Sequence, residues 1–121
     1  MKGKLYTSYF ANIMNIPHSM RVFSVVRQPQ DIPNIIDLSP SAGLLNQYKS
    51  KRITYEDFSK RFINELANNP KASVMFDSLS NLLNQGIDVV LVCYEKNSTF
   101  CHRKILGEIF STSGIEYCGE V

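Results

Sequence analysis

The sequence predicts a single small α/β domain of three layers, spanning residues 1–121, with a mostly parallel sheet of about four strands. Strand-like and helix-like segments alternate along the chain, and Pro or Gly residues separate them. The run 87–94, IDVVLVCY, is β-branched and apolar on both faces, as is typical of a central parallel strand covered on both sides. With 121 residues, of which 44% are hydrophobic, the chain has the length and core of one domain.

The N-terminal third is predicted to contain two strands joined by loops. Residues 5–10, LYTSYF, alternate and are rich in aromatic side chains, and residues 21–26, RVFSVV, follow the same pattern. Residues 11–19 are predicted to be a loop. Residues 28–40 contain three prolines and are also predicted to be a loop, with a short extended piece at Ile35-Ile36.

The middle of the chain is predicted to form three helices. Ser39-Pro40 offers a capping hydroxyl and a first-turn proline to the first helix. Thr54 with Asp57 approximates a capping box for the second, which ends near Pro70, and Gly86 ends the third. The apolar stripes at helical spacing are Leu44, Leu45 and Tyr48; Phe58, Phe62, Ile63 and Leu66; and Ala72, Met75, Phe76, Leu79, Leu82 and Leu83.

The C-terminal third is predicted to be one strand–helix–strand unit. Residues 101–112 carry a helical apolar stripe that stops at Gly114, and residues 115–118 form a last short strand. Such a unit is parallel and right-handed. We therefore expect residues 89–94 to be central in the sheet, with helices on both of its faces.

Composition excludes several classes of protein. The longest apolar run, 89–93, is far shorter than the roughly 20 residues of a membrane span. The basic N-terminus lacks the apolar stretch of a signal peptide. Three cysteines argue against a secreted disulfide scaffold and for the cytoplasm, and a net charge of +2 argues against a nucleic-acid partner. A homodimer stays open.

The junction between the central strand and the last helix carries the most reactive residues. Ser98 or Thr99 could cap the helix, whose free N–H groups and dipole favour an anion. Arg103 adds a planar donor fork suited to phosphate or carboxylate. Cys101 near the helix N-terminus is expected to have a lowered thiol pKa, and the adjacent His102 can hold a proton near neutral pH.

Each of these residues also has an ordinary structural interpretation. Cys101 could be a small buried residue, and Arg103 could pair with Glu95 or Glu108. Neighbouring side chains on a helix point roughly 100° apart, so a direct dyad of Cys101 and His102 is awkward.

These residues resemble the signature of a widespread prokaryotic family, domain of unknown function 488. Its members have a strand ending in Cys-x-Glu, a short loop, and Cys-His-Arg opening a helix. The matching segments here are Leu91-Val92-Cys93-Tyr94-Glu95 and Cys101-His102-Arg103, with Tyr6-Thr7-Ser8, Leu38-Ser39-Pro40, Leu44-Leu45, Tyr48-Lys49 and residues 54–62. The resemblance implies a compact α/β fold and brings no established activity.

One departure from the family pattern lies at the second strand. Many members end this strand with Asp-x-Arg, whereas Val25-Val26-Arg27 keeps the arginine and lacks the carboxylate. Any acid–base role of that carboxylate therefore does not carry over to this chain.

The first functional hypothesis is a small-molecule-binding domain for a phosphorylated or nucleotide-like anionic ligand, acting as sensor, sponge or enzyme. Ligands of parallel sheets bind beyond the carboxyl ends of the strands. Two arginines suit an anion, Glu95 and hydroxyls suit a ribose, and an aromatic ring (Tyr9, Tyr94 or Phe100) could stack on a base. The expected ligand-binding residues are Thr7, Ser8, Tyr9, Arg27, Glu95, Ser98, Thr99, Cys101, His102 and Arg103.

The alternative hypothesis is a thiol-dependent enzyme or redox protein that uses Cys101 with Cys93, which could form a disulfide if their Cα atoms come within about 7 Å. Burial of Cys93 in a strand, which raises a thiol pKa, counts against it. The candidate catalytic residues are Cys101, His102 and Glu95, and whether the protein is an enzyme stays open. A metal site formed by Cys93, Cys101 and His102, with or without Cys118, matches no common zinc spacing, so we predict no metal and no cofactor.

Overall fold

The computed structural model describes residues 2–27, 31–96 and 101–121. In this part of the chain, the strands β1 (Leu5–Tyr9), β2 (Arg21–Ser24), β3 (Val89–Cys93) and β4 (Tyr117–Glu120) form one sheet. The strand order is β2-β3-β1-β4, and every pair is parallel. All residues of β3 are buried, which confirms the central parallel strand that the sequence predicts.

Four α-helices and two 3-10 helices complete the described fold. They are η1 (Phe10–Asn15), η2 (Ile36–Leu38), α1 (Ala42–Lys49), α2 (Tyr55–Ala67), α3 (Pro70–Asn84) and α4 (His102–Thr112). Thr54 caps α2 as predicted, and Asn69 caps α3 with Pro70 in its first turn. The cap of α1 is Ser41 rather than Ser39, because its side chain accepts a hydrogen bond from the Leu44 N–H.

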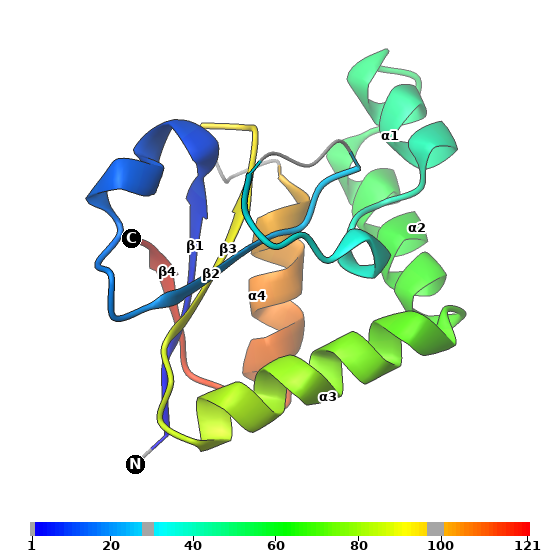
Figure 1. Ribbon diagram of the computed structural model, residues 1–121. Helices are drawn as coiled ribbons and strands as arrows, with labels where there is room; N and C mark the ends of the chain where they lie inside the picture. The colour runs from blue at the N-terminus through cyan, green and yellow to red at the C-terminus, as the bar shows by residue number, and fades with distance from the viewer. Residues whose placement is uncertain (1, 28–30, 97–100) are drawn as a thin grey trace.

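Helical segments cover both faces of the sheet, as the three-layer prediction has it, but the two faces receive different kinds of helix. The α-helices all contribute to the core on one side, where they meet Leu5, Val89 and Leu91. On the other side Val90 and Val92 pack against residues of η1 and the chain that follows it. Figure 1 shows α3 and α4 next to the sheet and α1 and α2 beyond them.

The strand order explains this asymmetry. The connection from β1 to β2 crosses the sheet in one direction, whereas the connections from β2 to β3 and from β3 to β4 both cross in the other. Because crossovers between parallel strands are right-handed, opposite directions place the connections on opposite faces. The short β1–β2 connection holds only η1, so the second face receives a 3-10 helix.

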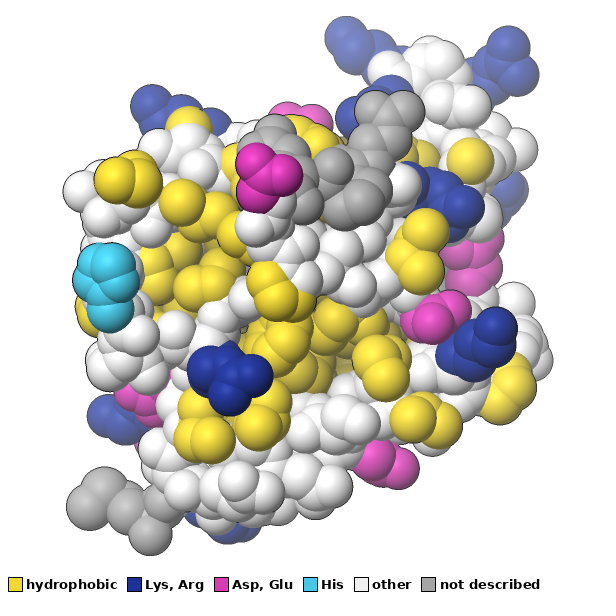
Figure 2. Space-filling view, in the orientation of Figure 1, with side chains coloured by type: hydrophobic (Ala, Val, Ile, Leu, Met, Phe, Trp, Pro, Cys, Tyr) yellow, Lys and Arg dark blue, Asp and Glu magenta, His cyan; other side chains and the backbone are white. Residues whose placement is uncertain are grey.

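Some apolar side chains remain exposed on the surface of the folded chain. Apolar side chains gather between the edge strand β2 and α3 on the face shown in Figure 2. None of the helices in the described residues has the length and apolar character needed to cross a membrane.

Two glycines make a matched test of this packing. A Cβ on Gly3 would lie 2.1 Å from the backbone oxygen of Ile87, whereas a Cβ on Gly43 in α1 would meet nothing within 4 Å. Gly3→Ala should lower the free energy of unfolding by more than about 1 kcal/mol, because backbone must move. Gly43→Ala should raise it by about 0.5–1 kcal/mol through helix propensity. Urea unfolding measures both, and a harmless Gly3→Ala would contradict the close approach.

Candidate functional site

The carboxyl ends of β2 and β3 open into a cleft of about 740 Å³. One wall consists of Cys93, Cys101 and His102, where β3 ends and α4 begins. Arg27 after β2 and Glu95 after β3 also line the cleft. The opposite wall is made by residues 39–49, mostly of α1. This volume is in the range of sites for small organic molecules.

Two thiols meet at the cleft wall. Cys93 is the last residue of β3, Cys101 is the N-cap of α4, and their Sγ atoms are 2.6 Å apart. Both cysteines are free, and they are only 1% and 3% exposed. A disulfide bond is about 2.05 Å long. A small displacement therefore suffices to join the two sulfur atoms.

The Arg103 guanidinium lies behind these thiols and is completely buried. Its Nε and Nη2 donate to the Glu120 carboxylate at 3.1 and 2.7 Å. Its Nη1 donates to Cys93 Sγ at 2.9 Å and to the backbone oxygen of Glu95, and Nη2 donates to the backbone oxygen of Lys96 at 3.1 Å. All five N–H groups of the side chain are thereby occupied.

This arrangement changes the role expected of Arg103. The sequence hypothesis has Arg103 binding a ligand, with Glu95 or Glu108 as its internal alternative. The carboxylate partner is instead Glu120 of β4, and Arg103 is not among the residues that line the cleft. Its position supports a role in holding the thiols and the chain around them.

The charge of the thiol pair lies on Cys93. The hydrogen bond from the Cys101 S–H lowers the pKa of Cys93 to about 7. Burial raises this pKa, whereas the nearby Arg103 charge also lowers it. The hydrogen bond to Cys93 and burial raise the pKa of Cys101. This reverses the expectation of a Cys101 thiolate. The hydrogen bond between the two thiols is the first cause of the difference, and Arg103 Nη1, which is 2.9 Å from Cys93 Sγ and 3.6 Å from Cys101 Sγ, adds to it.

His102 is held as a neutral imidazole next to the thiols. Its Nε2 lies 2.5 Å from the backbone oxygen of Val25, to which it donates, so Nδ1 is left unprotonated. Nδ1 lies 3.9 Å from Cys101 Sγ. Contact between these sequence neighbours is feasible because Cys101 is extended (φ −119, ψ 147) and not yet helical. Burial lowers the pKa of His102 to about 4.

Glu120 is the site residue that sequence reasoning missed. It is the last residue of the short strand β4 and belongs to no motif. It accepts hydrogen bonds from Arg103 and from the Thr7 hydroxyl, which is also 2.7 Å from Tyr117 Oη. The available signal was an acidic residue at the carboxyl end of a parallel strand, the same edge as the Cys-x-Glu element.

The remaining predicted ligand residues separate into three groups. Arg27, Glu95, Cys101 and His102 line the cleft as expected. Thr7 and Ser8 are fully buried and bond within the sheet edge, Thr7 to Glu120 and Ser8 to Asn12 and Val121, and Tyr9 does not line the cleft. Ser98 and Thr99 lie outside the described residues, and Cys101 occupies the N-cap of α4 without a side-chain cap bond.

One cluster in the described residues has ligand atoms close enough to hold a metal ion. The thiols of Cys93 and Cys101 and the His102 imidazole lie within 4.8 Å of one another. The Arg103 guanidinium, 2.9 Å from Cys93 Sγ, already supplies positive charge there and opposes a second cation. Cys118 is exposed on β4 and does not belong to this cluster.

Comparison with known proteins supports the sequence resemblance. The family model described as "Active DUF488-N3 subclade" matches residues 9–114, which include the Cys93-x-Glu95 and Cys101-His102-Arg103 segments. Searches of the curated proteins and of the solved structures gave no match.

Alkylation of the native protein tests which thiol carries the charge. The rate at which iodoacetamide modifies Cys93 should rise with pH around an apparent pKa of about 7, below the ordinary 9.0. Exposed Cys118 serves as the internal control. Desolvation and Glu116 raise its pKa, so its reaction rate should show an inflection at higher pH. Peptide mapping by mass spectrometry separates the sites. A lower inflection for Cys101 than for Cys93 would refute the assignment.

Stability at acid pH tests the buried imidazole. The unfolded chain protonates His102 near pH 6.5, whereas the folded protein does so only near pH 4. The unfolded state therefore binds more protons in this window, and the free energy of unfolding should fall by up to about 3 kcal/mol as the pH drops through it.

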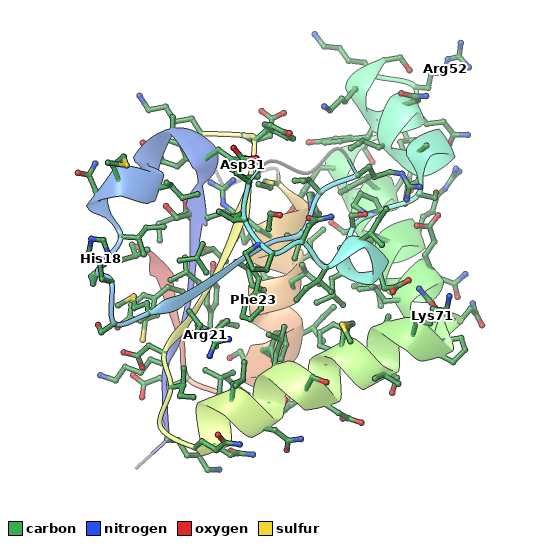
Figure 3. The ribbon with its side chains drawn as sticks, viewed as in Figure 1. His18, Arg21, Phe23, Asp31, Arg52 and Lys71 are labelled. Atoms are coloured by element: carbon green, nitrogen blue, oxygen red, sulfur yellow. The ribbon has the colours of Figure 1, made fainter. Side chains whose placement is uncertain are left out.

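Urea unfolding at pH 7 and pH 5 should show a smaller difference for His102→Gln than for the wild type. His18 is exposed in the loop before β2 (Figure 3), and His18→Gln is the matched control that should keep the wild-type difference. An unchanged difference in His102→Gln would show that other groups cause the acid sensitivity.

Proposed function

The chain belongs to the DUF488 family, and from the geometry of its cleft we propose that it is a thiol-dependent redox protein. Cys93 and Cys101 would cycle between a dithiol and a disulfide. The observation that carries this proposal is the contact of the two Sγ atoms at 2.6 Å on the wall of a cleft, with Arg103 Nη1 2.9 Å from one of them. An ionised thiol with a second thiol next to it is the arrangement that thiol–disulfide exchange requires.

The proposed reaction is the two-electron reduction of a small disulfide. The Cys93 thiolate attacks one sulfur of the substrate R–S–S–R, which forms a mixed disulfide and releases one thiolate, RS⁻. Cys101 then gives its proton to this thiolate and attacks Cys93 Sγ. The second RS⁻ leaves, and the Cys93–Cys101 disulfide remains. The protein loses two electrons and the substrate gains them, and an external thiol returns the protein to its dithiol form.

Neighbouring residues support both steps. The hydrogen bond from Cys101 and, after it, the charge of Arg103 bring the pKa of Cys93 to about 7, and Glu120 fixes the guanidinium from its other side. Once Cys93 is in the mixed disulfide, the S–H of Cys101 is free to turn to the unprotonated Nδ1 of His102, which lies 3.9 Å from Cys101 Sγ and orients this thiol for the second step. A reducing cytoplasm, which keeps structural thiols reduced, is the compartment that fits this cycle.

The first hypothesis from the sequence, binding of a phosphorylated or nucleotide-like anion, uses the same cleft. Arg103 no longer supports it, because its donors are occupied, but Arg27 and Glu95 do line the cleft. In this proposal, anion recognition selects the molecule that reaches the thiols.

Reaction with dithiobis(nitrobenzoate), a small aromatic disulfide, tests the cycle. The experiment uses a Cys118→Ser background, since Cys118 is exposed. The dithiol protein should release two equivalents of the coloured thiolate per chain, retain no adduct and become two hydrogens lighter. Absorbance and intact mass measure these results.

Single variants in the same background identify the roles. Cys101→Ser should release one equivalent of the coloured thiolate and retain the adduct on Cys93. Cys93→Ser should lose the fast release of the coloured thiolate. Circular dichroism confirms that each variant is folded. Two stable adducts on the dithiol protein, or a dithiol protein that does not react, would refute the redox cycle.

A further inference from the structure

Two cationic side chains of the cleft have no part in the thiol chemistry. Arg27 follows β2, and within the described residues its Nη1 donates to the backbone oxygen of Pro40 at 3.4 Å. Lys49 is the exposed last residue of α1. Among the described residues neither side chain forms an ion pair, yet both line the cleft. Their charges are therefore available to a ligand.

Between these cations and the thiols, the cleft offers apolar surface. Pro40, Leu45, Tyr48 and Phe58 line it together with Val26. Sites of this kind bind organic molecules through an apolar lining and a few polar groups that set orientation. A bare inorganic anion would leave this lining without contacts, so the cleft fits a molecule that has both an anionic group and an apolar or aromatic body.

The charges of the cleft also limit where the anionic group can sit. Cys93 and Glu95, on the β3 side, repel an anion. Arg27, which follows β2, and Lys49, at the end of α1, attract one, and a guanidinium can donate two parallel hydrogen bonds to phosphate or carboxylate. Glu95 can instead accept a hydrogen bond from a ligand hydroxyl. The ligand is thereby oriented, with its uncharged part toward the thiols.

We propose that the cleft binds a small aromatic or apolar molecule with a terminal phosphate or carboxylate, and that Arg27 and Lys49 hold this anionic group. This inference deepens the proposed function, because it names the class of molecule that is presented to Cys93. As a statement about the substrate, the inference rests on the proposed function. Arg27 and Lys49 are binding residues in this scheme, and neither touches the reacting sulfur atoms.

Binding is measured in a variant that cannot undergo the redox cycle. In the Cys93→Ser/Cys101→Ser double variant, calorimetric titrations compare adenosine monophosphate with adenosine, and phenyl phosphate with phenol. We expect the phosphorylated member of at least one pair to bind ten or more times more tightly than its uncharged partner. Inorganic phosphate alone should bind more weakly than the phosphorylated member.

Charge-removing variants locate the anion. Arg27→Gln and Lys49→Gln should each abolish most of the preference for the phosphorylated probe. Arg52→Gln is the matched control, because Arg52 lies beyond the end of α1 at the outer corner of the molecule (Figure 3) and does not line the cleft. This variant should keep the preference.

The outcomes separate the two proposals. Equal binding of the charged and uncharged probes in both pairs overturns the anion site, as does an equal loss in Arg52→Gln, and neither result affects the thiol cycle. A tenfold preference for phosphate that depends on Arg27 supports the anion site even if the reaction with dithiobis(nitrobenzoate) shows no disulfide formation. That second failure would refute the redox cycle alone.

Discussion

The buried guanidinium of Arg103 is the constraint on which the site depends. Moving a charge out of water costs several kcal/mol unless it is paired and hydrogen-bonded. Arg103 is fully buried, and the Glu120 carboxylate with the backbone oxygens of Glu95 and Lys96 satisfies it. These partners come from β4 and from the chain after β3, so one side chain at the start of α4 fixes three segments relative to one another.

The same guanidinium contributes to the chemistry of the thiols. Its charge is shared between Glu120 and Cys93, so it stabilises the thiolate only in part. Together with the hydrogen bond from Cys101, which is the larger cause, this charge brings the pKa of Cys93 to about 7, close to neutral pH. A thiol that is partly ionised at ambient pH combines a useful fraction of thiolate with high nucleophilicity. The Arg103–Glu120 pair is thus a structural element that also adjusts reactivity.

Sequence patterns predicted features that lie within one continuous segment of the chain. They did not predict contacts between side chains that come from different strands of the sheet. The central strand, the Thr54 cap and the grouping of Cys93, Glu95, Cys101 and His102 follow from local patterns within one strand–loop–helix unit. The partner of Arg103 could not be predicted, because it depends on β4 lying next to β1 in the sheet. That pairing also explains why Thr7 bonds Glu120 instead of lining the cleft. The lowered pKa of Cys93 depends on the hydrogen bond between the two thiols and then on the distance of each sulfur from Arg103 Nη1, and no sequence pattern encodes this geometry.

Burial of the thiols joins the redox proposal to the shape of the cleft. Cys93 and Cys101 are almost fully buried, so a large protein disulfide has no direct access to them, whereas Cys118 on β4 is exposed. A reagent must therefore enter the cleft before it meets the thiolate, and the side chains at its opening decide which molecules do so. In the proposed binding mode, Arg27 and Lys49 would attract an anionic end, and Glu95 and the Cys93 thiolate would keep that end away from the sulfur. Selectivity in this protein would then come from the cleft, while the reactivity of the sulfur is set from behind by Arg103.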